Sequence, residues 1–271
     1  MDLGLKGKAA LLVGASRGIG GATAVALARE GCAVAILARG QAGAEERARE
    51  CLEAGAPAAI GIAADATHPE QLRTALDAAL RHLGQLDVLV TLVGGSSPGG
   101  FAELDQAAWQ SAFDRNLFAA VRISQLALPH LLASAERERA VESAGGRARG
   151  MPAIVHVTSI WGREGGGPIT YNAAKAALIS LAHEQHRELA PKGIRVLSVA
   201  PGSTLHAGGS WEKRVAKDPD GMREFVAREI PFGRFGTAEE LGDVIAFLCS
   251  PRASWVGGAC VAVDGGQSRS F

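Results

Sequence analysis

The sequence is poor in cysteine, in aromatic residues and in net charge. None of its four cysteines shows Cys-x-x-Cys spacing, which indicates reduced structural thiols rather than a disulfide framework or a metal site. Lys plus Arg and Asp plus Glu balance at 28 each, so no basic excess points to nucleic acid. No apolar run approaches the ~18 residues of a membrane span, and the first residues lack the order of a signal peptide. We therefore expect a cytoplasmic protein without nucleic-acid or membrane partners.

The 271 residues instead hold a regular alternation of short apolar runs and helical patterns. The runs expected as strands are residues 8–14, 33–39, 58–63, 86–93, 153–159, 193–200 and 259–263. No linker or break in composition separates them. The pattern predicts an α/β fold, a single doubly wound Rossmann-type domain over residues 1–271, with a parallel seven-stranded sheet and helices on both faces.

Three segments depart from this alternation. Residues 103–142 read as one long helix that Pro129 should bend or interrupt, followed by an exposed loop over residues 143–151. The arginines of this loop lack the interleaved aromatic residues of a nucleic-acid site. Residues 203–235, broken by Gly208-Gly209, Pro219 and Pro231, have the character of a lid over a substrate.

A glycine-rich turn joins the first expected strand to a helix ending near Glu30. Its sequence, Gly14-Ala15-Ser16-Arg17-Gly18-Ile19-Gly20, has the spacing Gly-x-x-x-Gly-x-Gly. Glycines allow close approach of a pyrophosphate, and a helix N-terminus offers unpaired N–H groups. Such patterns also arise by chance in glycine-rich chains, so the turn alone does not settle the function.

The end of the second expected strand favours NADP(H) over NAD(H). An NAD site usually places a carboxylate there for the ribose hydroxyls, whereas this chain has Ala38 followed by Arg39. Arg17 adds a second guanidinium, and arginines suit a 2′-phosphate. The alternative is that both arginines are solvated loop residues.

Tyr171 and Lys175 are four residues apart in a helical pattern, so their side chains share one face. Tyr171 is the only tyrosine of the chain. A free phenol has a pKa near ~10, and a nearby ammonium should lower it into the range of general acid–base catalysis. An ordinary surface pair is the alternative. His183 and His186 have no third ligand at useful spacing, so we expect no metal site.

Taken together, the motifs resemble those of the short-chain dehydrogenase/reductase family, of the type related to 3-oxoacyl-carrier-protein reductases. They occur in the family's order over nearly the whole chain: the turn at residues 14–20, Asp65, Asn116, Ser159, Tyr171-x-x-x-Lys175, Pro201-Gly202 and Val263-Asp264-Gly265-Gly266.

The resemblance implies a role for each matching position. The pyrophosphate and adenosine side of the cofactor would be held by Gly14, Ser16, Arg17, Gly18 and Ile19, the adenine by Asp65 and Ala66, and the nicotinamide side by Gly94, Pro201, Gly202 and Thr204. Ser159 would hydrogen-bond the substrate oxygen, Tyr171 would transfer the proton, Lys175 would lower the Tyr171 pKa and bind the ribose, and Asn116 would hold a relay water. Asp65, Asn116, Ser159 and Thr204 also have plain structural explanations as turn, surface, strand-end and loop residues.

Two departures from the family concern the fourth strand and the substrate side. The family usually shows Asn-Asn-Ala-Gly where this chain has Thr91-Leu92-Val93-Gly94, so the amides that brace the sheet centre are missing. Residues expected to face the substrate are Trp161, Arg163, Glu164, His206 and Trp211, with Arg122 and Arg163 as candidates for an acyl-carrier-protein contact.

The sequence thus predicts NADPH-dependent reduction of a ketone to a secondary alcohol, reversible, with Tyr171 as general acid/base. The expected substrate is a 3-oxoacyl thioester or another small or cyclic ketone. The alternatives are an NAD-dependent secondary-alcohol or polyol dehydrogenase and a non-catalytic dinucleotide sensor, which would have lost Ser159, Tyr171 or Lys175. By analogy with the family we expect a homotetramer or homodimer.

Overall fold

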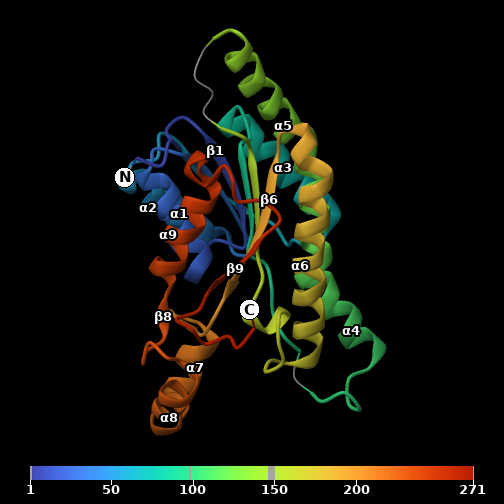
Figure 1. The fold of residues 1–271 in the computed structure, drawn as a ribbon, viewed down its shortest axis with the longest axis vertical. Helices are drawn as coiled ribbons and strands as arrows, with labels where there is room; N and C mark the ends of the chain where they lie inside the picture. The colour runs from blue at the N-terminus through green and yellow to red at the C-terminus, as the bar shows by residue number, and fades with distance from the viewer. Residues whose placement is uncertain (1, 98, 146–149, 271) are drawn as a thin grey trace.

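The computed structural model describes residues 2–97, 99–145 and 150–270, and its centre is a seven-stranded parallel sheet (Figure 1). The order across the sheet is β3-β2-β1-β4-β5-β6-β9. The strands are β1 (Ala9–Val13), β2 (Ala33–Ala38), β3 (Ala59–Ala63), β4 (Val88–Thr91), β5 (Ala153–Val157), β6 (Arg195–Pro201) and β9 (Cys260–Val263). This confirms the fold class expected from the sequence.

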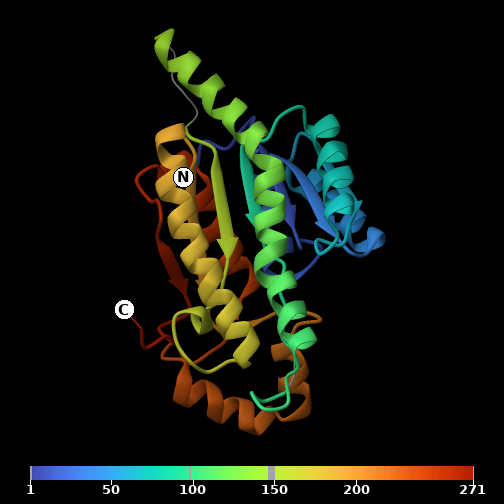
Figure 2. The same cartoon turned by 90° about the vertical axis from the view of Figure 1, so that its right-hand side faces the viewer.

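Helices cover both faces of the sheet and explain why the central strands are apolar throughout. The helices α1 (Gly18–Arg29), α2 (Gln41–Ala54) and α9 (Ala238–Cys249) pack on one face, around a core that includes Leu12, Leu27 and Ile245. The helices α3 (Pro69–Leu83), α5 (Ala119–Ser143) and α6 (Ile169–Leu189) cover the other. Figure 2 shows α5 in green beside α6 in yellow-orange across this second face.

The strand order reverses beside β1, which pairs with β2 on one side and β4 on the other. In an open parallel sheet, the crevice outside the carboxyl ends at such a reversal is where ligands bind. The carboxyl ends of β1, β4, β5 and β6 therefore mark the part of the fold in which the candidate site should lie.

The long helix expected over residues 103–142 is interrupted, but not at Pro129. It consists of α4 (Gln106–Phe113), a π-helical turn η1 (Asp114–Phe118) and α5, and Pro129 lies inside α5 without ending it. Of the bend or interruption expected at Pro129, the interruption is therefore wrong, and the departure from α-helix lies earlier, at η1. Of the expected loop, residues 146–149 lie outside the described residues.

The α4–α5 segment also corrects the expectation about apolar runs. An 18-residue window within Gln106–Ser143 has a mean hydropathy of 1.3, so by length and composition this segment could cross a membrane. Helix α5 uses its apolar face to pack on the sheet through Ile123, Ala127 and Leu131. Core helices of folded domains pass the same composition test, so the segment carries little information about membranes.

The expected lid is more regular than its glycines and prolines predict. Residues 203–235 include β7 (Thr204–Leu205), α7 (Ser210–Lys217) and α8 (Pro219–Glu229), and β7 pairs with β8 (Gly236–Thr237). Asp218 separates the two helices: it follows the last residue of α7 and is the N-cap of α8, where its side chain accepts from the N–H of Gly221 at 2.9 Å. Pro219 is the first residue of α8, a position that does not need a backbone N–H donor. Figure 1 shows α7 and α8 projecting beyond the carboxyl ends of the strands.

Candidate active site

A cavity of about 470 Å³ lies at the carboxyl ends of the strands, beneath α7. Ten of the cofactor and catalytic residues expected from the sequence line it: Gly14, Arg17, Ile19, Gly94, Ser159, Tyr171, Lys175, Pro201, Gly202 and Thr204. Six do not line it, namely Ser16, Gly18, Arg39, Asp65, Ala66 and Asn116. The structure thus brings together the residues expected at the reacting end of a cofactor.

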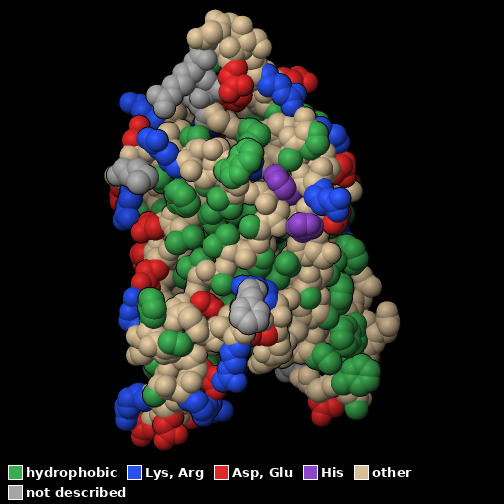
Figure 3. Space-filling model, in the orientation of Figure 1, with side chains coloured by type: hydrophobic (Ala, Val, Ile, Leu, Met, Phe, Trp, Pro, Cys, Tyr) green, Lys and Arg blue, Asp and Glu red, His purple; other side chains and the backbone are tan. Residues whose placement is uncertain are grey.

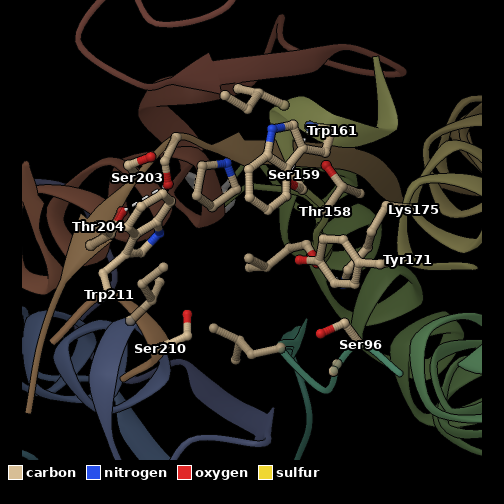
Figure 4. A pocket seen from close by; sticks show the side chains of 18 of the residues that line it. Ser96, Thr158, Ser159, Trp161, Tyr171, Lys175, Ser203, Thr204, Ser210 and Trp211 are labelled. Carbon is tan, nitrogen blue, oxygen red and sulfur yellow. Dashed lines mark hydrogen bonds between the residues drawn. The ribbon is translucent and has the colours of Figure 1, made fainter. Parts of the chain in front are cut away.

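Tyr171 and Ser159 meet inside this cavity. Ser159 follows β5 in extended conformation, and its Oγ accepts from the N–H of Trp161 at 3.2 Å, which fixes its position. Tyr171 stands in the first turn of α6, and Figure 4 shows its ring beside Ser159 with the hydroxyl toward the cavity. Burial raises the pKa of the Tyr171 phenol, and a hydrogen bond with Ser159 opposes that rise.

Lys175 is held one turn further along α6. Its Nζ donates to the carbonyl oxygen of Val157 at 3.0 Å and lies 5.5 Å from the centre of the Tyr171 ring. Burial lowers the pKa of Lys175 to about 8. The expectation that Lys175 lowers the Tyr171 pKa is not met, because the ammonium lies over the ring and bonds a carbonyl, and burial dominates the phenol.

Asn116 supports this arrangement from outside the cavity. It lies in the π-helical turn η1, where its Nδ2 donates to the carbonyl oxygens of Gly95 and Ala112, both at 2.8 Å. Its Oδ1 accepts from the N–H of Gly95 at 3.2 Å. Such π-turns inside helices occur frequently at functional sites, and the sequence pattern gave no sign of this one. The expected relay water remains a prediction.

Gly94 leaves room between Asn116 and Lys175. A Cβ atom at this position would lie 2.9 Å from Asn116 Oδ1 and 3.2 Å from Lys175 Nζ. Both separations are shorter than ordinary carbon contacts. A side chain at this position would therefore displace Asn116 or Lys175, and glycine lets both approach the end of β4.

The glycine-rich turn fits a pyrophosphate. At Gly14, φ is +91°, and a Cβ would lie 3.1 Å from backbone atoms of Leu92 and Val93. Arg17 is the N-cap of α1 but makes no side-chain cap bond, and the first turn of α1 holds no acidic residue. The N–H groups at this helix end and its positive dipole therefore suit an anion. The residues present fit a nicotinamide dinucleotide.

The adenosine end matches the expectation in part. Arg39 is exposed just after β2, and Ala38 before it is buried. Asp65 accepts from the N–H and the hydroxyl of Thr67, at 2.9 and 2.8 Å, and these bonds lower the pKa of its carboxyl. The charge of Arg39 adds a minor contribution in the same direction. Asp65 is thus held in place and ionised, beside the buried Ala66.

The nicotinamide end is formed where β6 meets the lid. Pro201 ends β6, and the hydroxyl of the buried Thr204 donates to the carbonyl oxygen of Gly202 at 3.3 Å. His206 comes so close to the glycine-rich turn that a Cβ on Gly18 would lie 2.7 Å from its ring. The base of the lid therefore rests on the turn that receives the pyrophosphate.

The expected substrate wall is confirmed for only some of its residues. Trp161, His206 and Trp211 line the cavity, whereas Arg163 and Glu164 do not. Glu164 instead accepts from the N–H of Arg269 at 2.9 Å and so anchors the C-terminal segment. The sequence reasoning missed Ser210 and Arg214, which line the cavity from α7. The Trp211–Arg214 spacing of three residues was an available signal once α7 is recognised as a helix.

Arg122 is engaged elsewhere. It pairs with Asp114 at 2.5 Å and donates to the carbonyl oxygen of Thr67, and it does not line the cavity. The carrier-protein contact suggested for it therefore gains no support.

The two helical histidines serve backbone contacts. His183 Nδ1 lies 3.1 Å from the carbonyl oxygen of Gly258, and His186 Nδ1 accepts from the N–H of Val196 at 3.4 Å. In the described part of the chain, no group of three or more metal-binding side chains occurs.

The missing amides of the fourth strand have a substitute. Thr91 Oγ1 lies 2.7 Å from His156 Nδ1, and His156 Nε2 lies 2.8 Å from Gln185 Oε1. His156 is completely buried, and burial lowers its pKa to about 4, so the ring is neutral. A neutral ring that accepts from Thr91 and donates to Gln185 links β4, β5 and α6.

A doubly wound sheet with an anion-binding turn and a Ser-Tyr-Lys cluster defines a nicotinamide-dependent oxidoreductase. The family described as enoyl-(acyl carrier protein) reductase matches residues 14–268. The chain is 36% identical to cis-4-hydroxycyclohexanecarboxylate dehydrogenase of Sinomonas cyclohexanicum over 263 residues, 96% of both chains. It is 32% identical to a 3-oxoacyl-[acyl-carrier-protein] reductase of Pseudomonas aeruginosa over 270 residues, covering 99% of this chain and 100% of that one.

A solved structure of L-sorbose reductase from Gluconobacter frateurii, complexed with NADPH and L-sorbose, aligns with a TM-score of 0.88 at 29% identity, covering 100% of both chains. The chain belongs to the short-chain dehydrogenase/reductase family, as its motifs indicated. It is an oxidoreductase that acts on CH–OH and C=O groups.

Proposed function

We propose that this protein reduces a ketone to a secondary alcohol with NADPH, reversibly, with Tyr171 as the general acid/base. The single observation that carries the proposal is the meeting of Ser159, Tyr171 and Lys175 in one cavity with the glycine-rich turn at its edge. A dinucleotide sensor would not need this cluster, which supports an enzyme over a binding protein.

The cluster suits proton donation at a substrate oxygen. Because burial raises the pKa of Tyr171, its phenol is protonated at neutral pH and able to donate. Ser159 would donate a hydrogen bond to the same oxygen and stabilise the negative charge that develops there. Lys175, with a pKa near 8, would carry positive charge at neutral pH beside the ring. When bound, the reduced nicotinamide supplies the hydride for the carbonyl carbon.

The preference for NADP(H) rests on the adenosine end. Arg39 is exposed at the end of β2, where an NAD site would offer a carboxylate. Replacing Arg39 by Ala should weaken NADPH binding by about 10-fold or more, because a charge-assisted contact is lost, and leave NADH binding nearly unchanged. Arg73→Ala, on the exposed side of α3, is the matched control. Equal binding of both cofactors by the unmodified enzyme would favour the NAD-dependent dehydrogenase instead.

The substrate class we propose is a small or cyclic ketone. The cavity of about 470 Å³ also has to receive the nicotinamide, so little room remains for a large body. Two relatives support two versions of this class, since one is a dehydrogenase of a hydroxylated ring acid and the other is a 3-oxoacyl thioester reductase.

The test is oxidation of NADPH and NADH by purified protein with a cyclic ketone, an aryl ketone, a keto-sugar and an acetoacetyl thioester. Turnover with NADPH on one class supports the proposal. Tight cofactor binding without turnover on any of them would overturn it and favour a sensor.

We also propose association into a homotetramer or homodimer. Strand β9 is one of the two edge strands of the seven-stranded sheet, and Figure 3 shows apolar side chains gathered over this part of the molecule, between α9 and α6. An unpaired strand edge offers N–H and C=O groups to a second copy. Sedimentation equilibrium at micromolar concentration tests this, and a monomer would exclude it.

A further inference from the structure

The cavity wall carries charge of one sign. Its lining holds Arg17, Lys175 and Arg214 but, among the described residues that form it, no Asp or Glu. Positive groups in a concave site attract anions and raise their local concentration. The pyrophosphate of a dinucleotide accounts for part of this charge, near Arg17, but not for all of it.

Two of these three cations are accounted for by the cofactor turn and by a buried hydrogen bond. Arg17 occupies the N-cap position of α1 at the glycine-rich turn, where the pyrophosphate is expected, and its guanidinium lies 3.0 Å from the position of a Cβ on Gly208. Lys175 is buried and donates to the carbonyl oxygen of Val157. Arg214 stands apart from the glycine-rich turn, on α7, and like the other two it takes part in no ion pair among the described residues. The nearby Glu212 accepts from the N–H of Gly208 at 2.7 Å.

Arg214 is nevertheless held in a defined place. Its guanidinium lies 4.8 Å from the centre of the Trp211 indole, a cation–π contact. Trp211 in turn packs on Phe225 at 5.0 Å and on Phe235 at 5.3 Å between ring centres. Packing on Phe225 and Phe235 thus fixes the position of the indole. The indole in turn orients the Arg214 guanidinium at the cavity mouth before any ligand binds.

An apolar wall connects this cation to the reacting centre. Trp161 lies 6.4 Å from Trp211 and 6.4 Å from Tyr171, measured between ring centres. Figure 4 shows Tyr171 and Trp211 on opposite sides of the cavity, with Trp161 between them. A substrate lying along this wall would meet the Tyr171 hydroxyl at one end, aromatic surface along its body and the guanidinium at the other end.

We infer that Arg214 binds a carboxylate of the substrate, and that the substrate is a small ketone or secondary alcohol whose apolar, ring-sized body separates that carboxylate from the reacting carbon. The inference rests on the proposed function and specifies its substrate class. Arg214 is placed to pair in bidentate fashion with a carboxylate, which a neutral isostere of the same shape cannot reproduce.

The experiment compares 4-oxocyclohexanecarboxylate with its carboxamide in the full-length enzyme. We expect Arg214→Gln to raise KM for the acid by about 10- to 100-fold, with kcat little changed, because the pair forms in the ground state as well as the transition state. KM for the carboxamide should change by less than about 3-fold. Lys213→Gln removes the same charge from the same helix outside the cavity lining and should leave both values unchanged.

Three results would overturn the inference. One is an unmodified enzyme that uses acid and carboxamide equally well. Another is an equal loss on both ketones in Arg214→Gln. The third is a weakening of NADPH binding that accounts for the whole effect, which would make Arg214 a cofactor residue.

A binding measurement separates this inference from the proposed reaction. Cyclohexanecarboxylate has no ketone, so its binding to the NADP-loaded protein, measured by calorimetry, does not depend on turnover. Binding that is lost in Arg214→Gln but kept in Lys213→Gln supports the carboxylate site even if every ketone fails, in which case only the reductase proposal falls. If cyclohexanecarboxylate binds Arg214→Gln as tightly as the unmodified protein, the carboxylate site is excluded, whatever the catalytic result.

Discussion

The ammonium of Lys175 lies 5.5 Å from the centre of the Tyr171 ring and is directed to the carbonyl oxygen of Val157 rather than to the phenol. Burial keeps Tyr171 protonated at neutral pH and lowers the pKa of Lys175 to about 8. This relationship leads to separate predictions for the two residues.

Replacing Tyr171 by Phe should lower kcat by about 10²- to 10⁴-fold, because the proton donor is removed from the cavity. The phenyl ring can keep the edge-on contact with Trp161, so the fold and NADPH affinity should be retained. Steady-state kinetics and fluorescence titration with NADPH measure the two effects. A variant with full turnover would exclude Tyr171 as the general acid/base.

Lys175 should make the stability of the protein rise with pH. Its pKa is about 8 in the folded chain and about 10.5 when unfolded, so between these values the unfolded chain binds more protons and rising pH favours the native state. From about pH 7 to about pH 9.5 the free energy of unfolding should grow by about 2 kcal/mol relative to Lys175→Met. Urea unfolding of both proteins at each pH gives the difference. If the free energy of unfolding changed with pH in the same way in both proteins, burial would not lower the pKa of Lys175.

Thr91→Val should destabilise the protein by about 1–3 kcal/mol, because it leaves His156 Nδ1 buried without its donor. Thr91→Ser retains the hydroxyl and is the matched control. Urea unfolding measures the loss. If the valine variant were as stable as the serine variant, the Thr91–His156–Gln185 network would not brace the sheet.

Gly94→Ala should lower kcat by about 10-fold or more, because the added Cβ would displace Asn116 or Lys175. Gly165→Ala is the control, since nothing lies within 4 Å of its added Cβ. Both variants should be assayed for kcat and for thermal stability. Unchanged turnover in Gly94→Ala would mean that the close packing at this glycine has no part in catalysis.

The fold was predictable because each element carries its own local signal. Strands such as Ala9–Val13 are continuous apolar runs, and Thr237 and Glu240 form the capping box that begins α9. Ser159, Tyr171 and Lys175 could be predicted as site residues from their motif spacing and from the rule that ligands bind at the carboxyl ends of strands.

What the sequence could not predict depends on three-dimensional surroundings. The direction of the Tyr171 pKa is set by burial, which helical spacing to Lys175 does not reveal. The hydrogen-bond network of His156 joins residues from two strands and a helix, and the role of Arg214 depends on how α7 folds over the cavity. The π-helical turn at Asn116 left no mark on the apolar periodicity around it.

Because Tyr171 is the only tyrosine, the tyrosine absorbance of the protein reports on its reacting centre alone. Ionisation of a phenol changes its ultraviolet absorbance, and the four tryptophans do not ionise in this range. An alkaline difference spectrum of the unmodified protein therefore titrates a single, identified group. Repeating it with cofactor bound would show directly how ligands shift that proton, without labels or substitutions.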